Sequence, residues 1–258
     1  MLLAIDIGNT NIVVGAMDKQ SGEIIFIART STDRVKTGDQ YAIQIKNILE
    51  LYNIRSADIC GAVVSSVVPP VSNAIISAIK TVCSKDINTL LVGPGIKTGL
   101  NILMDNPGQV GSDLIVNAIA ALKEYKPPLA IVDMGTATTI SVIDKDGNYI
   151  GGQIIPGVMI SLNALSSLAA QLPAISLDSP KKVIGKNTID CMRSGLIYGN
   201  AAMLDGVIER IEEELGSEVT AILTGGVSVC IAPFCKKKIV HDENLLLKGL
   251  FHVYNKNI

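Results

Sequence analysis

Aromatic residues are scarce in this sequence, and it has no excess of positive charge. Tryptophan is absent and aromatic residues make up only 3% of the 258 residues, which leaves few rings for stacking the bases of single-stranded nucleic acid. The 22 lysines and arginines do not outnumber the 24 aspartates and glutamates, and the formal net charge is −2. A chain with this balance lacks the electrostatic attraction typical of proteins that bind nucleic acids or anionic membranes. We therefore expect neither as a partner.

Residues that bind metals through nitrogen or sulfur are also few. The chain has two histidines and five cysteines, and no two cysteines form a Cys-x-x-Cys pair. The cysteines are Cys60, Cys83, Cys191, Cys230 and Cys235. This pattern argues against a zinc site and favours free thiols in a reducing cytosol.

Long apolar runs are absent as well. Residues 59–79 and 147–177 carry no charge, but proline, glycine, serine, asparagine or glutamine interrupts each of them. Neither offers the roughly 20 apolar residues that a membrane span needs. The opening Met-Leu-Leu-Ala-Ile-Asp lacks the positive start of a secretory signal. We expect a cytoplasmic protein.

Apolar strands and amphipathic helices alternate along the chain, which predicts an α/β fold. Each half opens on a hairpin followed by a third strand, near residues 2–28 and 129–155, which predicts mixed rather than purely parallel sheets. Helices are expected behind a cap at Thr37 or Asp39, over 70–83, over 112–125, from about Thr188, and over 244–254. We place the domain boundary so that residues 1–126 form one domain and residues 127–258 the other.

The same motif stands at the head of both halves. Residues 6–14 (DIGNTNIVV) align with residues 133–141 (DMGTATTIS). A glycine in such a turn lets backbone N–H groups approach phosphate oxygens, and the hydroxyl and amide side chains add neutral donors. The carboxylates of Asp6 and Asp133 cannot favourably bind phosphate directly, so cations must lie between. One such motif is common in ordinary hairpins. Two copies, with a later Thr224-Gly225-Gly226 turn, predict a nucleotide bound between two similar subdomains.

The chain resembles the acetate and sugar kinase/Hsp70/actin superfamily in these two hairpins and the glycine turn. Further motifs, in order, resemble type III pantothenate kinase over nearly the whole chain. They are Asp105-Asn106-Pro107, Gly111-Ser112-Asp113, the Asp133 motif, Gly151-Gly152 through Pro156-Gly157, Gly185-Lys186-Asn187-Thr188 and Ser194-Gly195. The resemblance implies a duplicated actin-like, ribonuclease H-like fold with a cleft between its subdomains. It also implies transfer of the ATP γ-phosphoryl group to pantothenate, the first step of coenzyme A synthesis.

The resemblance assigns roles to particular residues. It implies an ATP phosphate loop with a Mg²⁺ contact at Asp6 and a proton acceptor at Asp113. It also implies a monovalent cation (K⁺ or NH₄⁺) at Asp133, an ATP contact at Thr136 and a pantothenate contact at Thr188. The loop comprises Asp6, Ile7, Gly8, Asn9, Thr10, Asn11, Ile12 and Val13. The substrate-binding set begins with Gly111, Ser112, Asp113 and Leu114. The family also implies a homodimer whose substrate pocket is completed near the subunit interface.

Two positions on the substrate side depart from the family pattern. Leu114 stands where the pattern has arginine, and Met104 stands where it usually has tyrosine. Leucine provides neither charge nor hydrogen-bond donors for an anionic substrate. Three outcomes remain open: another cation such as Lys186 or Arg193 takes over, a different small alcohol is accepted, or the chain is a weakened paralogue that binds nucleotide as an accessory or regulatory protein. The motifs expected of an acetate or sugar kinase substrate site are not found.

Overall fold

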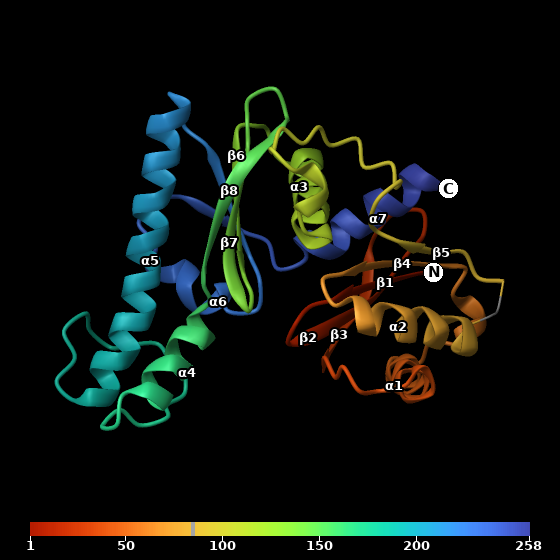
Figure 1. The fold of residues 1–258 in the computed structure, drawn as a ribbon, viewed down its shortest axis with the longest axis horizontal. Coiled ribbons are helices and arrows are strands. Elements are labelled where there is room, and N and C mark those ends of the chain that lie inside the picture. The colour runs from red at the N-terminus through yellow and green to blue at the C-terminus, as the bar shows by residue number, and fades with distance from the viewer. Residues whose placement is uncertain (84–85) are drawn as a thin grey trace. The chain divides into compact units, whose positions relative to one another are not determined.

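The computed structural model describes residues 1–83 and 86–258, which form two compact units (Figure 1). The first unit contains residues 1–99, 106–120 and 245–258, and the second contains residues 100–105 and 121–244. The expected boundary between residues 126 and 127 divides the chain once. The two units instead exchange segments, because residues 245–258 pack in the first unit and residues 100–105 in the second.

A five-stranded mixed sheet forms the centre of the first unit, in the order β3-β2-β1-β4-β5. Strand β1 pairs antiparallel with β2 and parallel with β4. The strands are β1 (Leu2–Ile7), β2 (Asn11–Met17), β3 (Ile24–Ser31), β4 (Gly61–Ser66) and β5 (Thr89–Leu91). The helices are α1 (Gly38–Leu51), α2 (Pro69–Val82), α3 (Ser112–Glu124), which continues into the second unit, and α7 (Leu245–Asn257).

Both faces of the first sheet are covered. Helices α1 and α2 pack on one another and on one face, and α7 contacts β1 and β4 (Figure 1). Leu2–Ile5 is completely buried, which explains why β1 is continuously apolar rather than alternating. Of the two cap candidates for α1, Thr37 is the one used: its hydroxyl accepts from the backbone N–H of Gln40, whose side chain accepts from the N–H of Thr37.

The second unit repeats the topology of the first. Its sheet has the order β10-β9-β6-β7-β8, with β6 antiparallel to β7 and parallel to β9. Its elements are β6 (Leu129–Met134), β7 (Ala137–Ile143), β8 (Tyr149–Pro156), α4 (Val158–Leu168), α5 (Thr188–Leu215), β9 (Thr220–Thr224), α6 (Ser228–Ile231) and β10 (Ile239–His241). Two matching mixed sheets confirm the predicted duplicated α/β fold. Within the described residues, no helix has the length and apolar character needed to cross a membrane.

The hairpins that carry the repeated motif differ by one residue. In the first, Asp6 pairs with Val13, whereas in the second Asp133 pairs with Thr139. The second turn is therefore one residue shorter than the gapless alignment of the two motifs implies. Beyond the turns, equivalent residues of the two units are those that pair with equivalent strand positions, so Val13 corresponds to Thr139.

Candidate active site

The first motif folds as a tight turn between two buried strand ends. Ile7 and Ile12 are completely buried and pair with each other, which anchors the turn on both sides. The backbone N–H of Gly8 donates to the carbonyl oxygen of Asn11 at 3.0 Å. A Cβ atom at Gly8 would lie only 3.0 Å from the same oxygen, so glycine suits this close approach. The side chains over 9–11 are exposed, so residues 8–11, named here the phosphate turn for the ligand expected of the motif, present their side chains and backbone to a phosphate group.

A serine on the neighbouring strand orients the Asp6 carboxylate. Asp6 pairs with Ser65 across the parallel strands β1 and β4, and the Ser65 hydroxyl donates to Oδ1 of Asp6. The other carboxylate oxygen lies 4.0 Å from the position that a Cβ of Gly8 would take, on the side of the phosphate turn. Ser65 lies outside the motifs that the sequence reveals. Its only signal is a Ser-Ser pair at the end of an apolar strand.

The next serine of β4 connects that strand end to helix α3. Ser66 pairs with Ile7, and its backbone N–H donates to the Ser112 hydroxyl at 3.1 Å, while Ser112 Oγ lies 3.1 Å from the Ser66 carbonyl oxygen. Ser112 is the first residue of α3. The motif Gly111-Ser112-Asp113 is thereby held at the carboxyl ends of β1 and β4, beside the phosphate turn of the same unit.

Asp113 lies half-buried in the first turn of α3. Burial raises the pKa of its carboxyl group, and the backbone N–H groups of Leu114 and of Asp113 itself oppose that rise by hydrogen bonding to the charged form. A Cβ at Gly111 would lie 2.4 Å from Oδ1 of Asp113. Glycine at 111 therefore leaves the space that the carboxylate occupies. A carboxylate with a raised pKa at a fixed position suits proton acceptance.

The second motif meets the glycine turn expected near the nucleotide. Asp133 is half-buried at the end of β6 and pairs with Thr224 of β9. Gly225 has φ = +95°, and a Cβ there would lie 2.6 Å from Oδ1 of Asp133 and 2.5 Å from the backbone nitrogen of Met134. Glycine is required at 225 by both its backbone conformation and this contact. Thr136 is exposed in the shorter turn.

The segment with Thr188 forms the entry to the long helix α5. Thr188 is the first helical residue and is exposed; the Asn187 side chain caps the helix by accepting from the N–H of Asp190 at 2.9 Å. Of the two cations that could replace the family arginine, Arg193 forms an ion pair with Asp178. Lys186 is exposed in the loop before α5.

The predicted residues are divided between the two units. The first unit holds the phosphate turn, Ser65 with Asp6, and the Gly111–Leu114 segment. The second holds Asp133, Thr136 and Thr188. Among the described residues, no cluster of three or more histidine, cysteine, aspartate or glutamate side chains is arranged to hold a metal.

Comparison with known proteins identifies the family. The type III pantothenate kinase family model matches residues 2–210. A type III pantothenate kinase of Bacillus cytotoxicus is 45% identical over 259 aligned positions, which cover 100% of this chain and 97% of that protein. The chain belongs to the type III pantothenate kinase family. It is accordingly an ATP-dependent kinase.

Solved structures support the fold of this type III pantothenate kinase family member. The activator of 2-hydroxyisocaproyl-CoA dehydratase from Clostridium difficile, solved with bound ADPNP, superposes with a TM-score of 0.57 at 12% identity and covers 98% of this chain and 93% of that one. Component A of the (R)-2-hydroxyglutaryl-CoA dehydratase of Acidaminococcus fermentans gives 0.55 at 14% identity, with coverages of 98% and 96%. At these identities the likeness concerns the fold alone.

The two departures from the type III pantothenate kinase pattern lie in different units. Leu114 is half-buried on α3, and its Cγ lies 3.8 Å from where a Cβ of Gly111 would be. Met104 is 38% exposed, and its sulfur lies 3.8 Å from where a Cβ of Gly151 would be. The side chain directly beside Asp113 is thus apolar in this chain.

Proposed function

We propose that this chain is a working pantothenate kinase, which transfers the γ-phosphoryl group of ATP to pantothenate to give 4′-phosphopantothenate in the first step of coenzyme A biosynthesis. The observation that carries the proposal is the Asp113 carboxylate. Burial raises its pKa, and Ser112 and Ser66 hold its helix beside the phosphate turn of the same unit. The 45% identical relative bears the same activity in its name.

In this proposal the turn at 8–11 binds the phosphates through backbone N–H groups and neutral side chains, with Ile7, Ile12 and Val13 supporting it from the strands. Mg²⁺, held by Asp6 together with the phosphates, would neutralise charge on the phosphoryl group. Asp113 accepts the proton of the primary hydroxyl of pantothenate. The hydroxyl oxygen bonds to the γ-phosphorus as the bond to the bridging oxygen breaks, and ADP leaves with that electron pair.

The proposal also assigns ligand contacts to residues of the second unit. Asp133 lies against the backbone of Gly225, so a carboxylate and peptide groups meet there. Oxygen donors of this kind suit K⁺ or NH₄⁺, and Thr136 is exposed to contact ATP. Thr188 is assigned to pantothenate. We include a cytoplasmic location in the proposal, because ATP is available there.

The experiment is a coupled assay of ADP release with and without pantothenate, in K⁺ and then in Na⁺ buffer. We expect release that depends on pantothenate and is faster in K⁺. Release without pantothenate, or none at all, would contradict the proposal. If calorimetry then detected ATP binding but no pantothenate binding, the chain would be a nucleotide-binding accessory protein instead.

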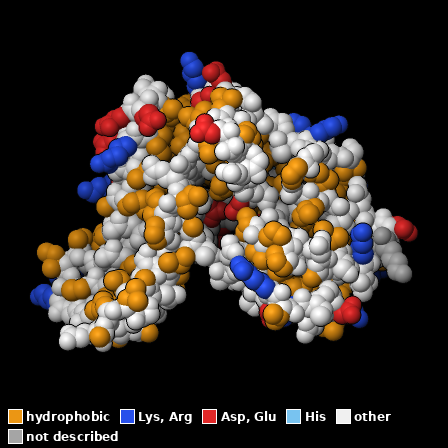
Figure 2. All heavy atoms as spheres, in the orientation of Figure 1, with side chains coloured by type: hydrophobic (Ala, Val, Ile, Leu, Met, Phe, Trp, Pro, Cys, Tyr) orange, Lys and Arg blue, Asp and Glu red, His pale blue; other side chains and the backbone are white. Residues whose placement is uncertain are grey.

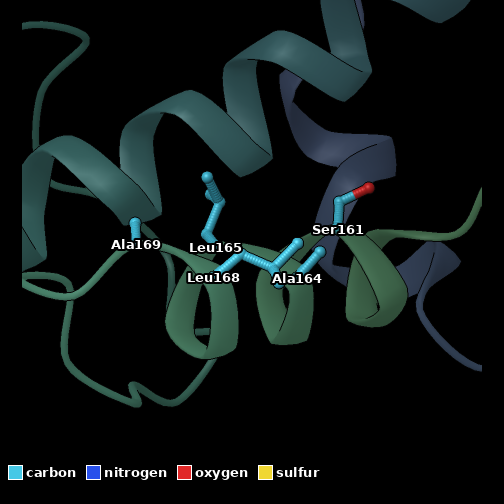
Figure 3. A pocket seen from close by; sticks show the side chains of 5 residues that line it. All are labelled: Ser161, Ala164, Leu165, Leu168 and Ala169. Carbon is cyan, nitrogen blue, oxygen red and sulfur yellow. The ribbon is translucent and has the colours of Figure 1, made fainter.

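We further propose that the chain forms a homodimer through an apolar surface on α4. Met159, Ile160, Leu165 and Leu168 are exposed there, and apolar side chains gather over this helix at the lower left of Figure 2. Ser161, Ala164, Leu165, Leu168 and Ala169 line a hollow of about 450 Å³ on the same helix (Figure 3). Contiguous exposed apolar surface is typical of protein interfaces.

Substitution on this surface tests the dimer. Leu168→Glu should shift the chain to the monomer in sedimentation experiments and weaken pantothenate binding, if the partner completes that pocket. Leu51→Glu is the matched control, because Leu51 is also a highly exposed leucine at a helix end, on α1. A wild-type chain that sediments as a monomer would contradict the proposal.

A further inference from the structure

The loop between β3 and α1 lies directly on the phosphate turn of the first unit. The backbone N–H of Thr32 donates to the carbonyl oxygen of Thr10 at 2.9 Å, and its hydroxyl donates to that of Gly8 at 2.6 Å. The guanidinium Nη2 of Arg34 donates to Oδ1 of Asn9 at 3.1 Å. Three hydrogen bonds therefore join this loop to three successive residues of the turn.

The rest of the loop is held from its other side. The Tyr41 hydroxyl donates to the Asp33 carbonyl oxygen at 2.6 Å and lies 3.1 Å from the Asp33 backbone nitrogen. The Asp33 carboxylate accepts from the N–H of Val35 at 3.0 Å. Because Tyr41 is buried in the core of the unit, the backbone on both sides of Arg34 is anchored. Arg34 itself is exposed, so its guanidinium is open to a ligand on the turn.

The motif that forms the phosphate turn has no cationic side chain of its own. Residues 6–11 provide one carboxylate and neutral donors only. A guanidinium has five N–H donors in a planar fork, so an arginine that gives one N–H to Asn9 retains others for phosphate oxygens. Arginine also keeps its charge at every physiological pH. Arg34 thus has the position and the chemistry to bind phosphate.

The duplicated unit provides an internal comparison. Asn11 pairs with Ser31 and Ala137 pairs with Pro156, so counting three residues beyond each pair sets Arg34 against Met159, which lies in α4. In the second unit the backbone at Gly157 closes on the turn instead, since a Cβ there would lie 2.1 Å from the Thr136 carbonyl oxygen. Of these two corresponding positions, only the one in the first unit carries a charge.

We propose that Arg34 binds the terminal phosphates of the nucleotide, with Asn9 orienting its guanidinium. This inference rests on the proposed function, because it requires ATP on the turn of the first unit. Arg34 neutralises part of the phosphate charge, and its contribution grows with the number of phosphates on the ligand.

The test compares the affinities of ATP, ADP and adenosine by calorimetry in the wild type and in Arg34→Met, Arg34→Lys and Arg55→Met. Arg55 is the control because it is an exposed arginine paired with Asp58 away from the turn. We expect Arg34→Met to lower the affinity for ATP about 10- to 100-fold and to leave the affinity for adenosine unchanged. The ATP affinity of Arg34→Lys should lie between those of the wild type and Arg34→Met, because lysine keeps the charge but not the planar set of donors.

The outcomes separate this inference from the function on which it rests. Wild type that binds no ATP would overturn both. Wild type that binds ATP, with Arg34→Met binding it equally well, would overturn the role of Arg34 alone. Equal losses of affinity for ATP and for adenosine would show that Arg34 merely supports the loop. If Arg34→Met unfolds, Arg34→Lys tests the role instead, because it retains the charge and most of the side chain.

Discussion

Replacing Gly111 by alanine tests whether the position of the Asp113 carboxylate determines the reaction rate. The added Cβ would lie 2.4 Å from Oδ1 of Asp113, whereas ordinary contact begins at 3.4 Å, so the carboxylate must move by about 1 Å. Misplacing a reacting group by about 1 Å costs roughly 100-fold in rate. We therefore expect kcat to fall about 100-fold in Gly111→Ala.

The assay is pantothenate-dependent ADP release, with ATP affinity and the urea unfolding midpoint measured beside it. Gly111 does not have a positive φ, so alanine is compatible with its backbone, and the free energy of unfolding should change by less than about 1 kcal/mol. Gly108→Ala is the matched control, because a Cβ there has no atom within 4 Å. Full activity in Gly111→Ala, or equal losses in both variants, would refute the reasoning.

Three further predictions concern the substrate site and the thiols. Leu114→Arg should lower the Michaelis constant for pantothenate about 10- to 100-fold, and an unchanged or higher constant would show a pocket built around leucine. Because burial raises the pKa of Asp113, the folded chain binds that proton more tightly than the unfolded chain, so stability falls as pH rises through the interval between the two pKa values. Asp113→Asn should therefore raise the urea midpoint at neutral pH while lowering kcat about 100- to 10,000-fold, and a lowered midpoint would contradict this. Burial raises the pKa of Cys83 and of Cys235 to about 11, so iodoacetamide at pH 8 should alkylate the exposed Cys60 and Cys191 before these two, as peptide mass spectrometry would show.

The sequence predicted the elements well because their signals are local. The apolar run at Leu2–Ile5, the proline at the start of α2 and the threonine before α1 each act within a few residues. The duplication was also predictable, since residues 6–14 and 133–141 share a pattern. The shorter second turn was not, because a turn's length depends on which residues pair across the hairpin.

The candidate site divides in the same way. Motif residues such as Asp6 and Asp113 were found from the sequence, and their roles remain predictions. Ser65, Thr32 and Arg34 were missed, because each reaches the motif through a contact between distant parts of the chain. Ser65 is 59 positions from Asp6, and Arg34 is 25 from Asn9. Only the pairing of β1 with β4 and the path of the chain after β3 bring these residues to the turn.

The packing of α7 on β1 and β4 has a consequence for the order in which the two units fold during synthesis. Leu247 lies against Gly15, Tyr254 against Gly61, and Gly249 against Val116, each too closely to admit a Cβ. The unit that a ribosome begins first therefore obtains its covering helix only after residues 121–244 have been translated, whereas the second unit, apart from residues 100–105, is continuous over 121–244. We expect the second unit to reach its native state first during synthesis, while part of the sheet of the first unit stays uncovered until α7 has been made.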